Sequence, residues 1–205
     1  SQRRGKFMAT SQILSKSEMT EEDIKYHYIT PAIEAKWDKS LILFERKITD
    51  GKINIMGNKT VREDAKKADY MLYMNPQFPL AIVEAKSNKF SISHGLQQAK
   101  QYAEMMKIPF AYSSNGDGFE EYDYLTGKER ILSLDEFPSL EELRDRYLHN
   151  CNDGNGITAE ENLLIEQPYY TDQNTYDPRY YQANAINLTL KAITKNQKRM
   201  HIVIW

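Results

Sequence analysis

Three charged residues, Asp69, Glu84 and Lys86, lie in segments that otherwise read as buried β-strands. Charges on a buried strand are costly unless they are paired or bind a metal ion. Lys86 follows Glu84 by two residues, so the pleat of one strand would place both side chains on the same face. Two converging carboxylates beside an ammonium group suit Mg²⁺, which takes one or two protein carboxylates together with water and phosphate oxygens. The pattern therefore predicts a metal site that hydrolyses phosphodiester bonds, with the lysine positioning the attacking water and stabilising the developing charge.

The spacing of these residues leaves a second interpretation open. Glu84 and Lys86 also suit an ordinary ion pair at the end of a strand, with Asp69 beginning the preceding strand by chance, because an acid–acid–lysine pattern is permissive. The apolar run of residues 80–83 just before Glu84 favours a site, since it is typical of a central strand that is covered on both faces.

Three further residues are candidates for the same site. Gln98 and Tyr102 are four apart on a predicted helix and share a face beside its apolar stripe, where they would reach a substrate backbone or the lysine. Glu21 falls on the core-facing side of an earlier predicted helix, with Ile24 and Tyr28, so its carboxylate needs a partner such as a metal ion. The alternatives are a solvated helix edge for Gln98 and Tyr102, and helix-dipole stabilisation for Glu21.

The elements that would position these residues form a mixed α/β pattern. Predicted strands over 69–74 and 80–85 carry the acids, and a predicted helix over 93–107 follows them. A helix is expected from Thr20 that breaks at Thr30-Pro31, with Thr30 capping a second short helix. A hairpin over 41–56 is expected to turn at Asp50-Gly51. The other expected elements are a strand over 110–113, a hairpin around 126–127 and a helix over 139–149. We predict one mixed central sheet flanked by helices.

Three regions are expected along the chain. Residues 1–19 are polar and lack periodicity, which predicts a flexible N-terminal arm. Residues 20–150 hold all the elements above and form the main domain. The loop CNDGNG at 151–156 is the clearest boundary signal, so residues 151–205 are interpreted as a linker and the beginning of a second domain. The apolar run HIVIW at 201–205 predicts that the polypeptide continues beyond this point.

Composition excludes several classes of protein. Of the 205 residues, 40% are apolar and 27% are charged, which supplies a real core and is unlike a disordered chain. A formal net charge of −2 excludes a strongly basic nucleic-acid-binding protein, although a local basic groove is still compatible with it. The single cysteine, Cys151, excludes an internal disulfide framework and fits a reducing compartment, so we expect a cytoplasmic protein. No run approaches the ~18 apolar residues of a membrane span.

The segments that carry the candidate site resemble a known family. KADYMLYMNPQFPLAIVEAKS, GLQQAKQYAEMMKIPFAYSSNGDGFEEYD and FPSLEEL are similar, in this order, to the N-terminal nuclease region of the restriction (R, HsdR) subunit of type I restriction–modification enzymes. The resemblance runs from about Thr20 to His149. That region has the PD-(D/E)xK nuclease fold, so the resemblance implies a restriction-endonuclease-like mixed sheet for residues 20–150.

The resemblance also implies roles for individual residues. Glu21 corresponds to the acidic residue of the family's first helix, with Glu22 beside it as the other possibility, and the metal ligands would be Glu21, Asp69 and Glu84. Ala68 stands where the motif's name has proline, a position that is commonly relaxed. The implied catalytic residues are Asp69, Glu84 and Lys86, followed by Gln98 and Tyr102 as the Q-x-x-x-Y element.

The last part of the chain resembles a second motif. DPRYYQANAINLTLKAITKNQKRMHIVIW is similar to the segment just before the Walker A loop of superfamily 2 helicase motors, which implies that Arg179, Tyr180 and Gln182 contact an adenine base. A capped amphipathic helix is the alternative for these residues. The sequence contains no G-x-x-x-x-G-K-[ST], so ATP is expected as a cofactor of the full-length protein and not of this piece.

The expected function is therefore a Mg²⁺-dependent endonuclease module that cuts double-stranded DNA with little sequence preference of its own. The resemblance assigns target recognition to the specificity and methylation subunits of a restriction complex, and it implies no membrane partner. A non-catalytic docking or DNA-binding domain of a helicase-like protein, with the same fold, is the alternative. An accessory domain of a repair helicase is a third possibility that differs only in its partners.

Overall fold

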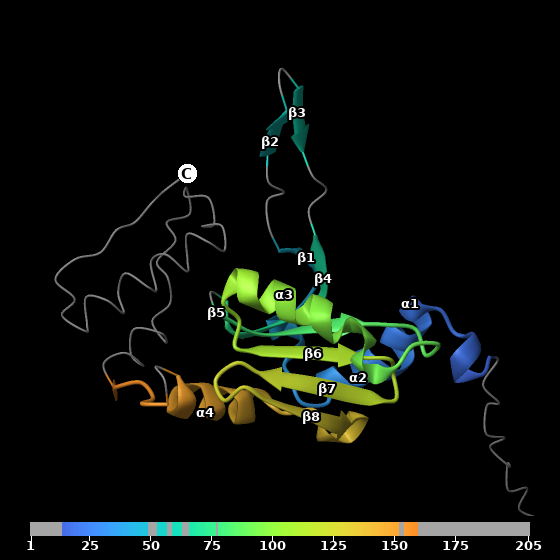
Figure 1. Ribbon diagram of the computed structural model, residues 1–205. Coiled ribbons are helices and arrows are strands. Elements are labelled where there is room, and N and C mark those ends of the chain that lie inside the picture. Colours follow the sequence, from blue (N-terminus) through green and yellow to red (C-terminus); the bar gives the residue numbers. More distant parts are fainter. Residues whose placement is uncertain are drawn as a thin grey trace, which may run out of the picture.

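A mixed six-stranded sheet, in the order β1-β4-β5-β6-β7-β8, forms the centre of the computed structural model (Figure 1). The structure describes residues 14–48, 53–56, 59–62, 66–76, 78–151 and 154–159. Strands β5 and β6 are parallel, and the other neighbouring pairs are antiparallel. The strands of this sheet are β1 (Ile42–Lys47), β4 (Lys67–Asn75), β5 (Phe78–Ala85), β6 (Phe110–Ser114), β7 (Gly118–Asp123) and β8 (Lys128–Ser133). The prediction of a mixed central sheet is confirmed.

One face of the sheet is covered by α3 (Leu96–Met106), which follows the short turn η4 (Ile92–Gly95). Because β5 and β6 are parallel, the chain must cross back between them, and α3 makes this crossing along the sheet (Figure 1). The apolar stripe predicted for this helix is confirmed, since all four of its side chains are buried: Leu96, Ala99, Ala103 and Met106.

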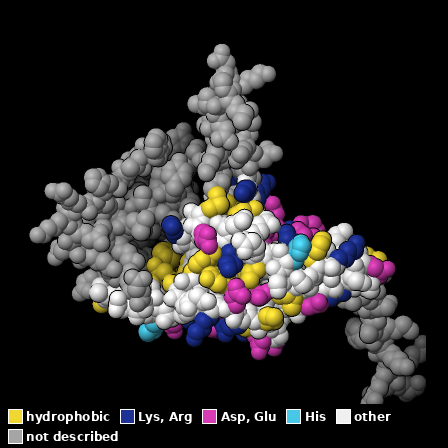
Figure 2. Space-filling model, viewed as in Figure 1, with side chains coloured by type: hydrophobic (Ala, Val, Ile, Leu, Met, Phe, Trp, Pro, Cys, Tyr) yellow, Lys and Arg dark blue, Asp and Glu magenta, His cyan; other side chains and the backbone are white. Residues whose placement is uncertain are grey.

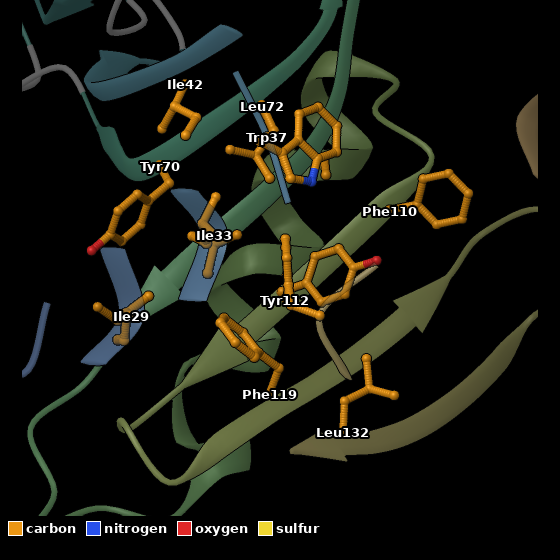
Figure 3. Close-up of a cluster of buried hydrophobic side chains, with 14 of the residues drawn as sticks. Ile29, Ile33, Trp37, Ile42, Tyr70, Leu72, Phe110, Tyr112, Phe119 and Leu132 are labelled. Atoms are coloured by element: carbon orange, nitrogen blue, oxygen red, sulfur yellow. The ribbon is translucent and has the colours of Figure 1, made fainter. Parts of the chain in front are cut away.

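The opposite face packs against the N-terminal helical segment and α4 (Leu140–Asn150). Figure 3 shows Ile29, Ile33 and Trp37 beside Tyr70 and the aromatic side chains of the central strands. The remaining described helical turns are η1 (Lys16–Glu18), η3 (Lys39–Leu41) and η5 (Leu134–Glu136). This two-sided burial fixes the sheet and thereby the strand ends that carry the candidate site.

The predicted helix break at Thr30-Pro31 is wrong. Helical backbone continues through α1 (Glu21–Ile24), the π-helical segment η2 (Lys25–Ile29) and α2 (Thr30–Glu34). Pro31 has no N–H and its ring would crowd an ordinary α-helical turn, and the wider π-turn precedes it directly, with the Thr30 N–H donating to the Lys25 carbonyl. The Thr30 hydroxyl does not cap a helix but lies 2.9 Å from the Tyr70 hydroxyl.

The predicted hairpin over 41–56 is also wrong. Strand β1 pairs with β4 in the main sheet, whereas β2 (Ile53–Met56) pairs with β3 (Lys59–Arg62) as a separate two-stranded sheet. Figure 1 shows this hairpin standing away from the main sheet. The missed signal was Gly57-Asn58, a two-residue hairpin sequence between β2 and β3. Strand β1 pairs with β4 because it then buries Ile42 against the core.

The region boundaries were predicted from sequence polarity. Residues 16–19, which fall in the predicted flexible arm, pack on the domain: Lys16 binds Asp117 at 2.8 Å and Met19 is buried. At the other end, the Ile157 N–H donates to the Leu148 carbonyl, so the described residues after α4 fold back on that helix.

The predicted adenine-contacting residues Arg179, Tyr180 and Gln182 lie outside the described residues. No helix in the described ranges is long and apolar enough to cross a membrane.

Candidate active site

Asp69 and Glu84 lie at the same end of the β4–β5 strand pair. Tyr70 and Val83 are cross-strand partners, and the two acids are the next residues outward on their strands. Beyond these residues a side chain takes the place of a backbone partner. The Ala85 N–H donates to Asp69 Oδ2 at 2.8 Å. The strand pairing thus holds the Asp69 carboxylate against the end of β5 and brings the two acids together, as the sequence predicts.

Glu84 is a buried acid, with 2% of its surface exposed. Burial, followed by the negative charge of the neighbouring Asp69, raises the pKa of Glu84 to about 9. Within the described part of the chain, Glu84 Oε1 is buried without a hydrogen-bond partner. Two adjoining carboxylates with an oxygen left unpartnered fit a divalent cation, which would supply the missing partner of that oxygen and favour the ionised form of Glu84.

Lys86 directly follows the last residue of β5. Its N–H donates to the Ser114 carbonyl at 2.8 Å, so the β5–β6 ladder extends to this residue. The half-buried side chain lies close enough to both Glu84 and Glu21 for its positive charge to lower their pKa values. The predicted grouping of the lysine with the acids is therefore present.

Glu21 begins α1 and is half-buried near the same acids. Burial raises its pKa, Lys86 opposes that shift and Asp69 adds to it. The side chain of Glu22 is 79% exposed and pairs with Lys25, so Glu21 is the acid of this helix that faces the site. Among the described residues no three His, Cys, Asp or Glu side chains form a group that could hold a metal ion. The structure therefore places two acids, Asp69 and Glu84, together at this strand end, with Glu21 nearby.

Gln98 and Tyr102 on α3 are joined to each other. Gln98 Nε2 donates to the Tyr102 hydroxyl at 2.9 Å. Tyr102 is 6% exposed and packs in the core under α3, and burial raises its pKa, with smaller contributions from Glu84 and Asp69. This helix face is therefore turned to the acids, and the solvated-edge interpretation does not describe Tyr102.

Gly95 brings the beginning of α3 onto the acids, a role that the sequence analysis missed. A Cβ at this position would lie 2.8 Å from Ser113 Oγ, 3.2 Å from Glu84 Cβ and 3.5 Å from Lys86 Cε. The Gly95 N–H donates to the same Ser113 hydroxyl at 3.0 Å. Space, and not an unusual φ, is what requires glycine here, because a side chain would push on the strand ends that carry the site.

Lys25 is the second residue of the site that the sequence analysis missed. Its Nζ lies 3.3 Å from Asp69 Oδ1, although 44 residues separate the two in the sequence. Spacing of four from Glu21 was the available signal, since it places Lys25 on the same helix face as a suspected site residue. The spacing does not predict that Asp69 is the partner of Lys25, because this contact depends on how the helical segment over α1 and η2 packs against the sheet.

The raised pKa of Glu84 predicts a pH dependence of stability. The folded-state pKa is above the unfolded value of 4.5, so the stability contribution is complete below about pH 4.5 and is lost as pH rises toward 9. Glu84→Gln cannot ionise and should avoid this loss. In urea melts with a chelator present, we expect its free energy of unfolding to exceed that of wild type by on the order of a few kcal/mol at pH 8, but not at pH 4. Parallel pH profiles for the two proteins would contradict the assignment.

Comparison with known proteins gives three matches. The family described as type I restriction enzyme R protein N terminus (HSDR_N) matches residues 20–138. The chain is 39% identical over 197 residues to the type I restriction enzyme EcoAI endonuclease subunit of Escherichia coli, covering 93% of this chain and 24% of that protein. It is also similar to a solved structure described as a fragment of an HsdR subunit of a type I restriction enzyme from Vibrio vulnificus YJ016. That match has a TM-score of 0.74 and 35% identity over 88% of this chain and 34% of the other.

Proposed function

The chain belongs to the family of type I restriction enzyme R subunits, and on that premise we propose that it is a Mg²⁺-dependent endonuclease module that hydrolyses phosphodiester bonds of double-stranded DNA. The observation that carries the proposal is the placement of Asp69 and Glu84 at the same end of the β4–β5 pair, close to Lys86, with one Glu84 oxygen buried and unpartnered in the described structure. A site kept only for packing would gain nothing from placing these two acids together, because the charge of Asp69 raises the cost of ionising Glu84.

The residues that would hold Mg²⁺ are Asp69 and Glu84, with Glu21 close by. When bound, the metal supplies a polarised phosphate oxygen and a water of lowered pKa. The ammonium group of Lys86 would orient the attacking water and stabilise negative charge as it develops on the phosphate. Tyr102, whose hydroxyl is held by Gln98, would help to fix the substrate backbone or the lysine.

The wider surface suits a module that depends on its partners for binding DNA. The formal net charge is −2, and Figure 2 shows acidic and basic side chains interspersed over the described surface in that view. Counterion release from phosphates therefore gives this module little affinity of its own. We assign sequence recognition to the specificity and methylation subunits of a cytoplasmic restriction complex.

The motor is proposed to lie outside this chain. The chain spans about a quarter of the length of the Escherichia coli relative that it matches. ATP binding, with the proposed adenine contacts of Arg179, Tyr180 and Gln182, would belong to the longer protein, and the piece described here would contribute the nuclease.

The proposal is tested by Asp69→Asn in the assembled restriction complex. We expect DNA cleavage to fall at least about a hundredfold, because one of the two metal ligands is lost, while ATP hydrolysis continues. Glu34→Gln is the matched control, since it removes a similar acid that pairs with the exposed Lys39 away from the site. Cleavage by Asp69→Asn at the wild-type rate would reject the nuclease function in favour of a non-catalytic docking domain.

A further inference from the structure

Lys25 connects the acids of the candidate metal site with two acids outside it. Its Nζ lies 3.3 Å from Asp69 Oδ1 and 3.7 Å from Glu45 Oε1, and it forms a close ion pair with Glu22. The Lys25 side chain is 12% exposed, whereas those of Glu22 and Glu45 are 79% and 55% exposed. The lysine therefore lies at the edge of the site, with a buried acid on one side and two exposed acids on the other.

The two oxygens of Asp69 have different partners. Oδ2 accepts the Ala85 N–H at 2.8 Å, a bond that ties the carboxylate to the end of β5. Oδ1 is the oxygen that contacts Lys25. A divalent ion that bound Asp69 through Oδ1 would meet the lysine ammonium on the same atom, and two cations sharing one oxygen repel each other.

Lys25 can leave Asp69 and still be paired with negatively charged side chains. A lysine carries its ammonium on a flexible four-carbon stem, and Glu22 and Glu45 are already within reach of it. The backbone of Lys25 is held by the π-helical segment, where its carbonyl accepts the Thr30 N–H. Only the side chain has to turn for the ammonium to leave Asp69.

We propose that Lys25 is a resident counter-cation of the metal site, which gives up Asp69 and keeps Glu22 and Glu45 when a divalent ion binds and so limits the affinity for that ion. This proposal rests on the proposed function, because it needs a metal ion on Asp69. Lys25 is a positioning residue under this assignment: it acts through Asp69 and contacts neither the substrate nor the metal ion.

The test is a calorimetric titration of the chain with Mn²⁺. Lys25→Met keeps the length of the side chain and removes its charge, and we expect about a tenfold lower dissociation constant than in wild type. Lys39→Met is the matched control. It removes the same charge from a lysine that is 78% exposed and pairs with Glu34, so its dissociation constant should stay within about twofold of wild type.

An unchanged or weakened affinity in Lys25→Met, with a wild-type melting temperature, overturns the proposal. A second measurement uses the wild-type protein and so does not depend on how the variant folds. In Mn²⁺-soaked crystals Lys25 Nζ should lie beyond hydrogen-bond distance of Asp69 Oδ1 and should contact Glu22 or Glu45, and an ammonium still on Asp69 beside a bound Mn²⁺ also overturns the proposal.

Titration of Asp69→Asn with Mn²⁺ distinguishes failure of the Lys25 proposal from failure of the proposed function. If Asp69→Asn abolishes Mn²⁺ binding while Lys25→Met leaves it unchanged, the role of Lys25 fails and the metal site stands. If Asp69→Asn binds Mn²⁺ as wild type does, Asp69 is not a ligand, and the proposed function fails together with the role of Lys25.

Discussion

Replacement of Lys86 by methionine is expected to lower DNA cleavage by the assembled restriction complex at least about a hundredfold, the effect of removing one positioned group that stabilises charge in a transition state. Methionine keeps the length and the packing of the stem, and the main-chain bond from residue 86 to Ser114 is retained. Binding of Mn²⁺ should persist, because both acids are still present. The measurement is the rate of double-strand breakage at saturating Mg²⁺.

Lys89→Met is the control for this variant. Lys89 is exposed, follows three residues later and belongs to the same loop, so its loss changes the net charge equally without touching the acids. If the two variants cleave at the same rate, the ammonium of Lys86 takes no part in the chemistry. If Lys86→Met fails to fold, the lysine serves the structure, as the docking-domain interpretation requires.

Arg146→Met is expected to cost about 3 kcal/mol of the free energy of unfolding. Arg146 donates to Glu121 at 2.7 and 3.1 Å and to Asp123 at 3.0 Å, and its guanidinium lies 4.7 Å from the centre of the Phe110 ring. The Glu121 side chain is 1% exposed, so removal of its main partner leaves a buried carboxylate poorly compensated. A loss of about 3–5 kcal/mol is usual when one side of a buried ion pair is removed.

The pKa of Glu121 supports the same expectation. Burial raises it, but hydrogen bonds from Arg146, Arg130 and Tyr112 outweigh burial and hold it below the ordinary value. Arg130→Met is the comparison, because Arg130 also binds Glu121 but its side chain is 45% exposed. Urea melts should show a clearly smaller loss for Arg130→Met. Equal losses, or none for Arg146→Met, would show that the buried network adds no net stability.

The residues of the site were predictable where local pattern determines their position. Asp69 and Glu84 interrupt apolar strands, and such an interruption has few explanations apart from an ion pair or a ligand. The helix stripe around Ala99 and Ala103 has a period of 3.6 residues, so the face turned to the sheet followed directly from the sequence. These predictions required only local sequence patterns and contacts between elements that follow one another in the chain.

The rest depends on contacts that are remote in the sequence. Strand β1 pairs with β4 across the intervening β2–β3 hairpin. The Gly57-Asn58 sequence could have indicated that β2 pairs with β3, but the apolar pattern does not show that β1 then pairs with β4. Lys25, the first residue of η2, acquires its role only when this helical segment lies beside β4. Pro31 is a helix-breaking signal that the π-turn before it accommodates, an outcome that local propensity does not anticipate.

The most direct test of the metal site is an anomalous difference map from crystals of the protein with a DNA duplex and Mn²⁺. DNA is included because phosphate oxygens complete the coordination of such ions. We predict a peak within about 2.0–2.4 Å of carboxylate oxygens of both Asp69 and Glu84. Bound duplex with no anomalous peak at these two carboxylates would contradict the account and leave the acids without a role in hydrolysis.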